Sequence, residues 1–167
     1  MANQVAIIMG SDSDWPVMEG CYKQLKEFGI NALVEVLSAH RTPELLADFV
    51  RSADQRGVRV FIAAAGMAAA LPGSVAALTH LPVIGVPLSS GDLKGLDSLL
   101  SIVQMPPGVP VATVAIGAAG AKNAALLAVQ ILALSDPKLT EALRKFKVDQ
   151  ATAVERKNKD LKERIVG

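Results

Sequence analysis

The sequence predicts an α/β fold: a three-layer sandwich with a central parallel sheet, followed by a long C-terminal helix. Two observations support this prediction. Short apolar runs, such as Val5–Met9, alternate along the chain with longer segments that carry helix start and stop signals. The apolar runs are continuous, which is typical of parallel strands that are buried on both faces. Because parallel neighbours are joined by right-handed crossovers, we expect a flavodoxin-like arrangement.

The elements follow one another in a regular order, separated by polar and small residues that mark turns. Strands are expected over residues 5–9, 32–37, 59–64, 83–86 and 111–116. Helices are expected over residues 15–28, 43–56, 74–78, 96–103, 118–134 and 137–165.

Capping residues set the helix boundaries. Asp14 is interpreted as the N-cap of the first helix, Pro16 fits its first turn, and Gly29 ends it. The second helix begins near Pro43 and ends at Gly57. A loop of small residues separates the third strand from its short helix. The helix before the C-terminal one is rich in alanine, and Asp and Pro at positions 136 and 137 start the last helix.

The whole chain, 1–167, is expected to form a single domain with an α/β core over 1–134 and a C-terminal helix over 136–165. Fifteen of the 33 charged residues lie in the last 32 positions, so this helix is too polar for the core. Its apolar residues form one stripe and a second patch: Leu139, Leu143 and Phe146, then Leu161 and Ile165. A frayed amphipathic tail is one interpretation. Packing against a neighbouring subunit is the interpretation that we prefer.

The charge pattern bears on partners. The formal net charge of +1 gives no electrostatic reason to expect nucleic acid or an anionic membrane as a partner. Between Phe61 and Leu134 only four residues are charged: Asp92, Lys94, Asp97 and Lys122. An uncharged surface is one explanation. We favour the other, that further subunits cover part of this segment and the protein is a homo-oligomer.

Several other classes of protein are not expected. The single cysteine, Cys21, excludes an intrachain disulfide and a cysteine-cluster metal site, and we interpret it as a packed side chain. The N-terminus carries no signal-peptide pattern, and no apolar stretch is long enough to predict a membrane span. These features predict a cytoplasmic protein.

The segment Ser38–Pro43 is the most informative one for function. It joins a predicted strand to a predicted helix, which is where open α/β sheets bind ligands. The imidazole of His40 suits proton transfer near neutral pH, and the guanidinium of Arg41 suits a phosphate or carboxylate. The second histidine, His80, precedes a strand and is interpreted as structural.

Two further loops follow predicted strands. Gly10–Asp14 combines a glycine that lets a ligand approach the backbone with hydroxyls and free N–H groups that favour an anion. Helix capping alone would use the same residue types, and the two interpretations have equal weight. Ala63–Gly73 contains no ionisable side chain. It is either a dry wall beside a ligand, suited to a reactive intermediate, or a packing loop.

Five segments together resemble a known family: residues 9–15, 38–43, 71–73, 97–106 and 122–128. In this order they resemble the 5-(carboxyamino)imidazole ribonucleotide mutases of de novo purine synthesis. The match covers about Val5 to Leu134. Ser38–Pro43 together with Gln104–Pro106 favours the mutase class over the sister class that uses free carbon dioxide.

The resemblance implies an isomerase that moves a carboxylate from the exocyclic nitrogen of an imidazole ribonucleotide to ring carbon 4. It implies no cofactor and no metal. It also implies a three-layer α/β fold, usually octameric, with active sites at subunit junctions. A carbamate whose nitrogen is protonated loses carbon dioxide, and a closed site holds that gas against the ring carbon at high effective concentration.

Site residues carry over by position. His40 becomes the expected catalytic residue, which gives a proton to the nitrogen and takes one from the carbon. The positions expected on the phosphate or ribose side are Ser11, Ser13 and Arg41. Asp14 matches a substrate-binding position, and Gly10 lets the ligand approach. The wall around the base is expected from Ser38, Ala39, Gly66 and Leu71.

The chain departs from the family pattern after the third strand. Many relatives read Gly-Ala-Gly-Gly-Ala-Ala-His-Leu-Pro-Gly there, where this chain has Ala64, Met67 and Ala70 in place of two glycines and the histidine. His40 is then the only histidine placed in the site, and Met67 is expected to narrow the pocket or shift its backbone.

Two alternative functions are consistent with the same fold. One is an aminoimidazole ribonucleotide carboxylase that uses free carbon dioxide. The other is a flavodoxin-like module that binds a flavin or nucleotide without catalysis. An aromatic content of 4% disfavours a flavin, whose ring usually packs against aromatic side chains.

Overall fold

The computed structural model describes residues 4–166. Its core is a five-stranded sheet in the order β2-β1-β3-β4-β5, with every neighbouring pair parallel. The strands are β1 (Val5–Met9), β2 (Ala32–Val36), β3 (Val60–Ala65), β4 (Val83–Pro87) and β5 (Ala112–Thr113). This is the flavodoxin-like strand order, in which the winding direction reverses between β1 and β3. The predicted fold class is confirmed.

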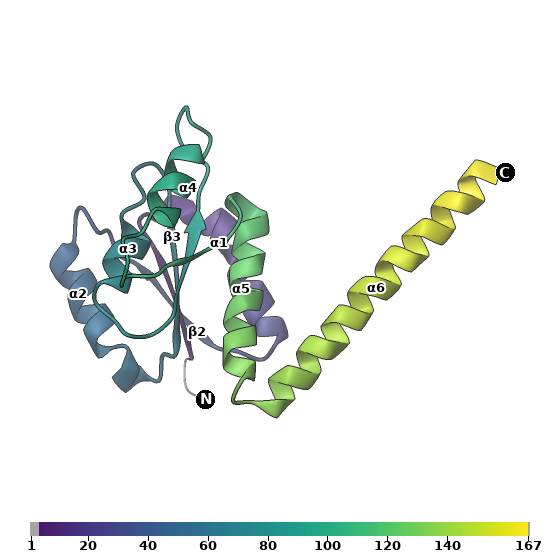
Figure 1. Ribbon diagram of the computed structural model, residues 1–167, viewed down its shortest axis with the longest axis horizontal. Helices are drawn as coiled ribbons and strands as arrows, with labels where there is room; N and C mark the ends of the chain where they lie inside the picture. Colours follow the sequence, from purple (N-terminus) through teal and green to yellow (C-terminus); the bar gives the residue numbers. More distant parts are fainter. Residues whose placement is uncertain (1–3, 167) are drawn as a thin grey trace.

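Helices cover both faces of the sheet (Figure 1). The helices are α1 (Trp15–Glu27), α2 (Pro43–Ser52), α3 (Leu71–Ala76), α4 (Leu96–Val103), α5 (Gly117–Ala133) and α6 (Pro137–Val166). Short 3₁₀ turns follow β1 (Asp12–Asp14) and α2 (Asp54–Arg56).

The alternation of side chains along each strand divides the core into two clusters. Odd-numbered β1 residues, such as Ile7, pack with α1 and α5, whereas even-numbered ones, such as Ile8, pack with α2, α3 and α4. Both faces of β1, β3 and β4 are therefore buried, which explains their continuous apolar sequences. Cys21 lies in the first cluster, and burial raises the pKa of its thiol to about 12. Its interpretation as a packed side chain is confirmed.

Three predicted elements differ from the structure by more than one residue at an end. The short helix predicted at 74–78 begins at Leu71, because Pro72 fits a first helical turn. The helix predicted over 43–56 ends at Ser52 and continues as a 3₁₀ turn up to Gly57, whose φ of 86° ends the segment. The strand predicted over 111–116 is shorter, because only Ala112 and Thr113 come into register with β4.

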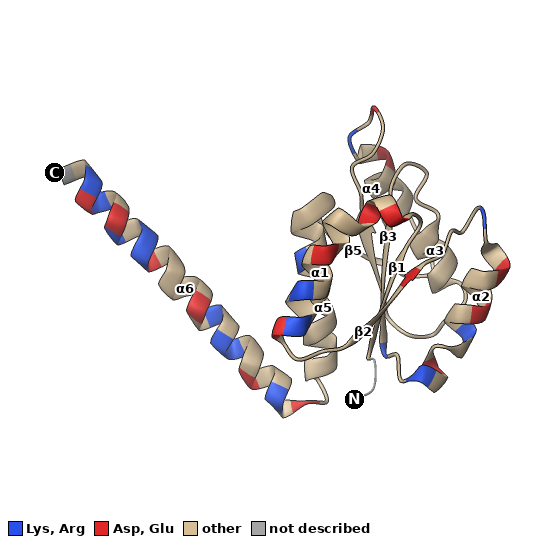
Figure 2. Ribbon diagram, turned by 180° about the vertical axis from the view of Figure 1, so that it is seen from behind, with Lys and Arg blue, Asp and Glu red and all other residues tan. Residues whose placement is uncertain are grey.

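The last helix leaves the body of the molecule (Figure 1). Asp136 caps it as predicted: its Oδ1 accepts the N–H of Lys138 at 2.9 Å. The first turns pack on α5, and Phe146 lies against Phe28 with 5.6 Å between ring centroids. Leu161 and Ile165 are 52% and 73% exposed. Figure 2 shows alternating acidic and basic residues along α6, against a largely uncharged α5.

Across residues 4–166, every helix is either too short or too polar to span a lipid bilayer.

Candidate active site

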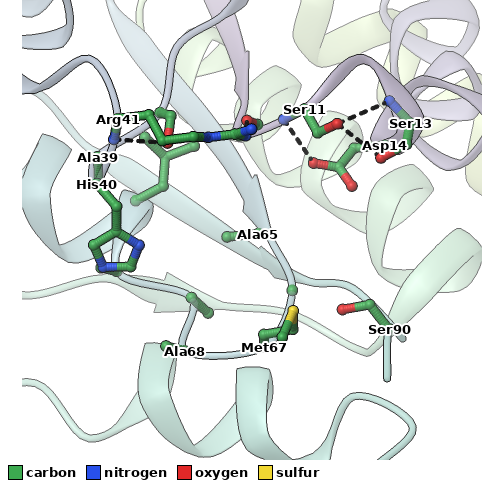
Figure 3. Close-up of a pocket in the computed structure, with 16 residues that line it drawn as sticks. Ser11, Ser13, Asp14, Ala39, His40, Arg41, Ala65, Met67, Ala68 and Ser90 are labelled. Carbon is green, nitrogen blue, oxygen red and sulfur yellow. Dashed lines mark hydrogen bonds between the residues drawn. The ribbon is translucent and has the colours of Figure 1, made fainter. Parts of the chain in front are cut away.

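A pocket of about 460 Å³ opens at the carboxyl ends of β1 and β3, where the winding direction of the sheet reverses. Its volume lies in the range of roughly 300–1,000 Å³ that is usual for small-molecule sites. Every residue predicted for the site lines this pocket: Gly10, Ser11, Ser13, Asp14, Ser38, Ala39, His40, Arg41, Gly66 and Leu71. The lining also includes Ala65, Met67–Ala70 and Ser90. Three loops that are distant in sequence therefore meet here (Figure 3).

The turn after β1 is held by a reciprocal pair of hydrogen bonds. The Ser11 hydroxyl accepts the backbone N–H of Ser13 at 3.2 Å, and the Asp14 carboxylate accepts the N–H of Ser11 at 3.2 Å. The Ser13 hydroxyl donates to Ser11 Oγ at 2.8 Å. Asp14 occupies the N-cap position of α1, as predicted. Its side chain, however, makes no capping hydrogen bond to that helix. The carboxylate is held in the 3₁₀ turn instead, at the wall of the pocket.

The electrostatics of Asp14 follow from this position. Burial raises the pKa of its carboxyl above the ordinary 3.8. The hydrogen bond from the Ser11 N–H and the charge of Arg41 act in the opposite direction, but the net direction is upward. A half-buried carboxylate in a ligand pocket is suited to accept hydrogen bonds from a hydroxyl or amine of a ligand.

The turn after β2 positions Arg41. The Ser38 hydroxyl accepts from both the backbone N–H and the Nε–H of Arg41, at 3.2 and 3.3 Å. Thr42 closes the turn, because its hydroxyl accepts the N–H of Ser38 at 3.0 Å. The other end of the guanidinium donates to the Gly10 carbonyl at 2.7 Å. Arg41 thus joins the first two turns across the pocket (Figure 3), which fixes a cation beside the serine-rich turn.

A smaller pocket of about 280 Å³ adjoins this one at Arg41. It shares Gly10, Ser11, Ser38 and Arg41 with the main pocket. Ser11, Ser38 and Arg41 therefore border both pockets, and the guanidinium can bind an anionic group of a ligand at this end.

His40 lies at the exposed tip of the same turn. Figure 3 shows its ring directed toward the loop that carries Ala68, on the opposite side of the pocket from Ser90. The imidazole is therefore placed against the apolar part of the pocket rather than against the serine-rich turn. The second histidine, His80, does not line the pocket.

The loop after β3 forms the apolar wall. Met67 and Ala69 adopt the left-handed conformation there, with φ values of 55° and 41°, which residues other than glycine rarely adopt. Met67 is 62% exposed and borders the pocket, as does Ala70. Ala64, the other departure from the family pattern, is fully buried within β3 and does not line the pocket. Only two of the three departures therefore face a ligand.

Ser90 is the polar pocket residue that the sequence did not predict. It follows β4, and its hydroxyl is buried. The sequence signal for this residue was its place after the carboxyl end of a central strand. The residues directly beside Ser89-Ser90 are uncharged, so nothing else in the sequence marked Ser90 as a site residue.

Acidic, histidine and cysteine side chains do not gather into a potential metal site anywhere in the described part of the chain. The pocket instead combines an imidazole with a fixed guanidinium, hydroxyls and one carboxylate, next to a wall without charge. This set can bind an anionic, hydroxyl-bearing ligand and transfer a proton at its far end.

The chain is similar to proteins of known family. Residues 4–153 match the family model described as AIR carboxylase. An N5-carboxyaminoimidazole ribonucleotide mutase of Pyrococcus abyssi is 59% identical over 87% of this chain and 83% of its own length. The corresponding mutase of Mycobacterium tuberculosis is 56% identical over 98% of this chain and 92% of its own.

A solved structure has the same fold. The crystal structure of Treponema denticola PurE superposes with a TM-score of 0.83 at 31% identity, covering 92% of this chain and 94% of that one. Sequence and structure lead to the same conclusion: the chain belongs to the AIR carboxylase family.

Proposed function

We propose that the chain is an N5-carboxyaminoimidazole ribonucleotide mutase of purine biosynthesis. It converts the ribonucleotide that carries a carbamate on its exocyclic nitrogen into the isomer that carries the carboxylate on ring carbon 4. The observation that carries the proposal is the identity of 54–59% to proteins named for this activity, over most of the chain. The enzyme is therefore an isomerase.

The pocket supports a two-step carboxyl transfer. Protonated His40 donates its proton to the carbamate nitrogen, and the N–C bond breaks to release carbon dioxide and the aminoimidazole. Ring carbon 4 then attacks the carbon dioxide, and neutral His40 removes the proton from that carbon. The histidine is protonated again at the end of the reaction, and the substrate and the product contain the same atoms. The apolar wall of the loop after β3 suits the intermediate, because carbon dioxide has no charge.

We assign the remaining roles by position in the pocket. Ser11, Ser13 and Arg41 bind the phosphate or ribose, since hydroxyls and a guanidinium meet there. Asp14 accepts a hydrogen bond from the ligand. Gly10 has no side chain, so the ligand can approach the backbone there. Ser38, Ala39, Gly66 and Leu71 enclose the base.

We extend the proposal to a cytoplasmic homo-oligomer of eight copies. Large apolar side chains are half exposed on and beside α4: Leu93, Leu96, Leu100 and Val103. The outer half of α6 extends away from the rest of its own chain (Figure 1). Contacts between copies would cover both surfaces, and α6 would then pack on a neighbouring subunit.

The two alternatives are less well supported. A carboxylase that uses free carbon dioxide would share this fold and pocket, but the similar proteins at 54–59% identity are named as mutases. A flavin-binding module needs an apolar aromatic surface, and among residues 4–166 no Phe, Tyr or Trp lines the pocket.

An isotope experiment tests the proposal. The enzyme is given substrate labelled with ¹³C in its carbamate, in the presence of excess unlabelled bicarbonate and without ATP. The mutase retains the label in the product, because the carbon dioxide does not leave the site. Loss of the label to the bicarbonate pool, or equally fast product formation from bicarbonate and the uncarboxylated ribonucleotide, would indicate the carboxylase instead.

A further inference from the structure

The hydroxyl of Ser90 has an unusual environment. The residue follows β4, and its Oγ is buried without a hydrogen-bond partner among the residues that the structure describes. Figure 3 shows this oxygen directed toward the pocket, beside Met67. A buried hydroxyl without a partner is costly, so a group that binds in the pocket is the natural partner.

Gly66 provides the space that the hydroxyl occupies. A Cβ built on Gly66 would overlap Ser90 Oγ and approach Ser90 Cβ to 3.1 Å. The φ of Gly66 is not positive, so the backbone alone does not require glycine there. The close approach of the loop after β3 to Ser90 does require it, and this contact fixes the hydroxyl at the edge of the apolar wall.

The polar groups of the pocket are unevenly distributed. Its other hydroxyls, its carboxylate and its charged or titratable groups come from the turns after β1 and β2. Residues 65–71 of the lining have no polar side chain. Among residues 4–166, Ser90 is therefore the one side-chain donor on the β3–β4 side of the pocket, opposite His40 (Figure 3).

We propose that Ser90 is a further substrate-binding residue whose hydroxyl donates a hydrogen bond to the carboxylate that the enzyme moves. This inference rests on the proposed function and names the part of the substrate that the hydroxyl contacts. A carboxylate that lies against an apolar wall needs a donor to compensate for lost water. A neutral hydroxyl supplies this hydrogen bond and does not compete with His40 for the proton that is transferred.

The experiment compares two ligands on three proteins. Binding of the 4-carboxylated aminoimidazole ribonucleotide and of the uncarboxylated ribonucleotide is measured by calorimetry for the wild type, Ser90→Ala and Ser89→Ala. Ser89 is the exposed neighbour and lies outside the pocket lining, so it is the matched control. Ser90→Ala should weaken the carboxylated ligand roughly 10- to 100-fold and leave the uncarboxylated one within about twofold, as expected for one hydrogen bond to a charged group.

Two further variants separate binding from structure. Ser90→Thr keeps the hydroxyl and should restore most of the discrimination between the two ligands. Gly66→Ala keeps Ser90 but displaces its hydroxyl, and should weaken the carboxylated ligand as Ser90→Ala does.

Equal weakening of both ligands by Ser90→Ala would overturn the proposal, as would unchanged binding of both. A change in subunit number without a change in discrimination would also overturn it, because it would assign the hydroxyl to a contact between copies. Failure of the wild type to interconvert the isomers would instead contradict the proposed function.

Discussion

At the scale of single residues, the site depends on side chains that are held before a ligand arrives. Arg41 is fixed at both ends, by Ser38 and by the Gly10 carbonyl, and the Asp14 carboxylate is tied to the Ser11 N–H. Such fixed groups reduce the entropy that binding must overcome. His40 differs, because it lies at an exposed position on the turn and faces the apolar wall.

Asp14 gives a prediction that separates stability from binding. Its raised pKa means that the folded state favours the protonated carboxyl, so its contribution to stability is complete below pH 3.8 and is lost as the pH rises through the folded-state pKa. Near neutral pH, Asp14→Asn should therefore be at least as stable as the wild type. Its amide oxygen can still accept the Ser11 N–H. Substrate affinity should fall roughly 10- to 100-fold, because a charge-assisted hydrogen bond is lost.

Urea unfolding of both proteins at several pH values tests the stability part, and KM tests the binding part. The advantage of Asp14→Asn should grow as the pH rises above 3.8 and vanish below it. A variant that is less stable than the wild type at neutral pH would contradict this account of Asp14.

The residues of the site were largely predictable because the chemistry lies in strand-end turns with distinctive residue types. A histidine and an arginine between a buried strand and a helix identified Ser38–Pro43, and family similarity added Gly66 and Leu71. Ser90 was missed because a serine after a strand is common. Its significance depends on a contact with Gly66 that no local pattern encodes.

At the scale of elements, the loop after β3 lines the pocket and also contains two residues with a strained backbone conformation. Met67 and Ala69 are in the left-handed region, which costs L-residues about 1 kcal/mol or more each. Glycine would adopt this conformation at a lower cost. The strain is compatible with a loop held in place by its neighbours: Ala69 and Leu71 are buried, and the Ala69 N–H donates to the Gly66 carbonyl at 3.0 Å.

Met67→Gly should therefore stabilise the fold. The side chain is mostly exposed, so little packing is lost, and relief of the left-handed strain should raise the free energy of unfolding by about 1 kcal/mol. The melting temperature should rise by about 2–4 °C. Met67→Ala is the matched control, because it removes the thioether but keeps a Cβ in the left-handed conformation. Equal stability of the two variants in thermal unfolding would show that backbone strain at Met67 is not the cause.

Sequence patterns predicted the order of elements well and their ends less well. Continuous apolar strands such as β1 and β3 were clear, because burial on both faces leaves no alternation to misread. The edge strand β5 was predicted over 111–116, but only 2 residues form it. Val111–Ile116 has the composition of a strand, yet only tertiary pairing with β4 decides how many of its residues form one.

At the scale of the whole molecule, the isolated chain leaves two apolar surfaces uncovered. One is the face of α4, where Leu96 is 54% and Leu100 is 50% exposed, and the other is the end of α6 with Leu161 and Ile165. Within the described part of the chain, the apolar contacts of α6 involve Leu139, Leu143 and Phe146, which lie in its first turns. We propose that packing against another copy stabilises this helix along its length, because most helical stability in proteins comes from tertiary packing.

A pair of substitutions tests whether α6 contacts a neighbour. Leu161→Glu combined with Ile165→Glu should lower the molar mass in light scattering after size exclusion. The core should remain folded, because both side chains are exposed in the single chain. Gln150→Glu combined with Thr152→Glu adds the same charge at exposed polar positions of the same helix and should leave the mass unchanged. An unchanged mass for the first pair would show that the apolar patch does not hold the oligomer together.

We propose that His40 moves the proton in a carboxyl transfer between nitrogen and carbon. The most direct measurement is an ultraviolet assay of the purified protein with 4-carboxylated aminoimidazole ribonucleotide, run beside His40→Asn. The wild type should consume the compound without ATP, and the variant, folded and with the same subunit number, should be at least about 100-fold slower. Turnover by His40→Asn at the wild-type rate would remove His40 from the mechanism, and no turnover by the folded wild type would contradict the mutase function itself.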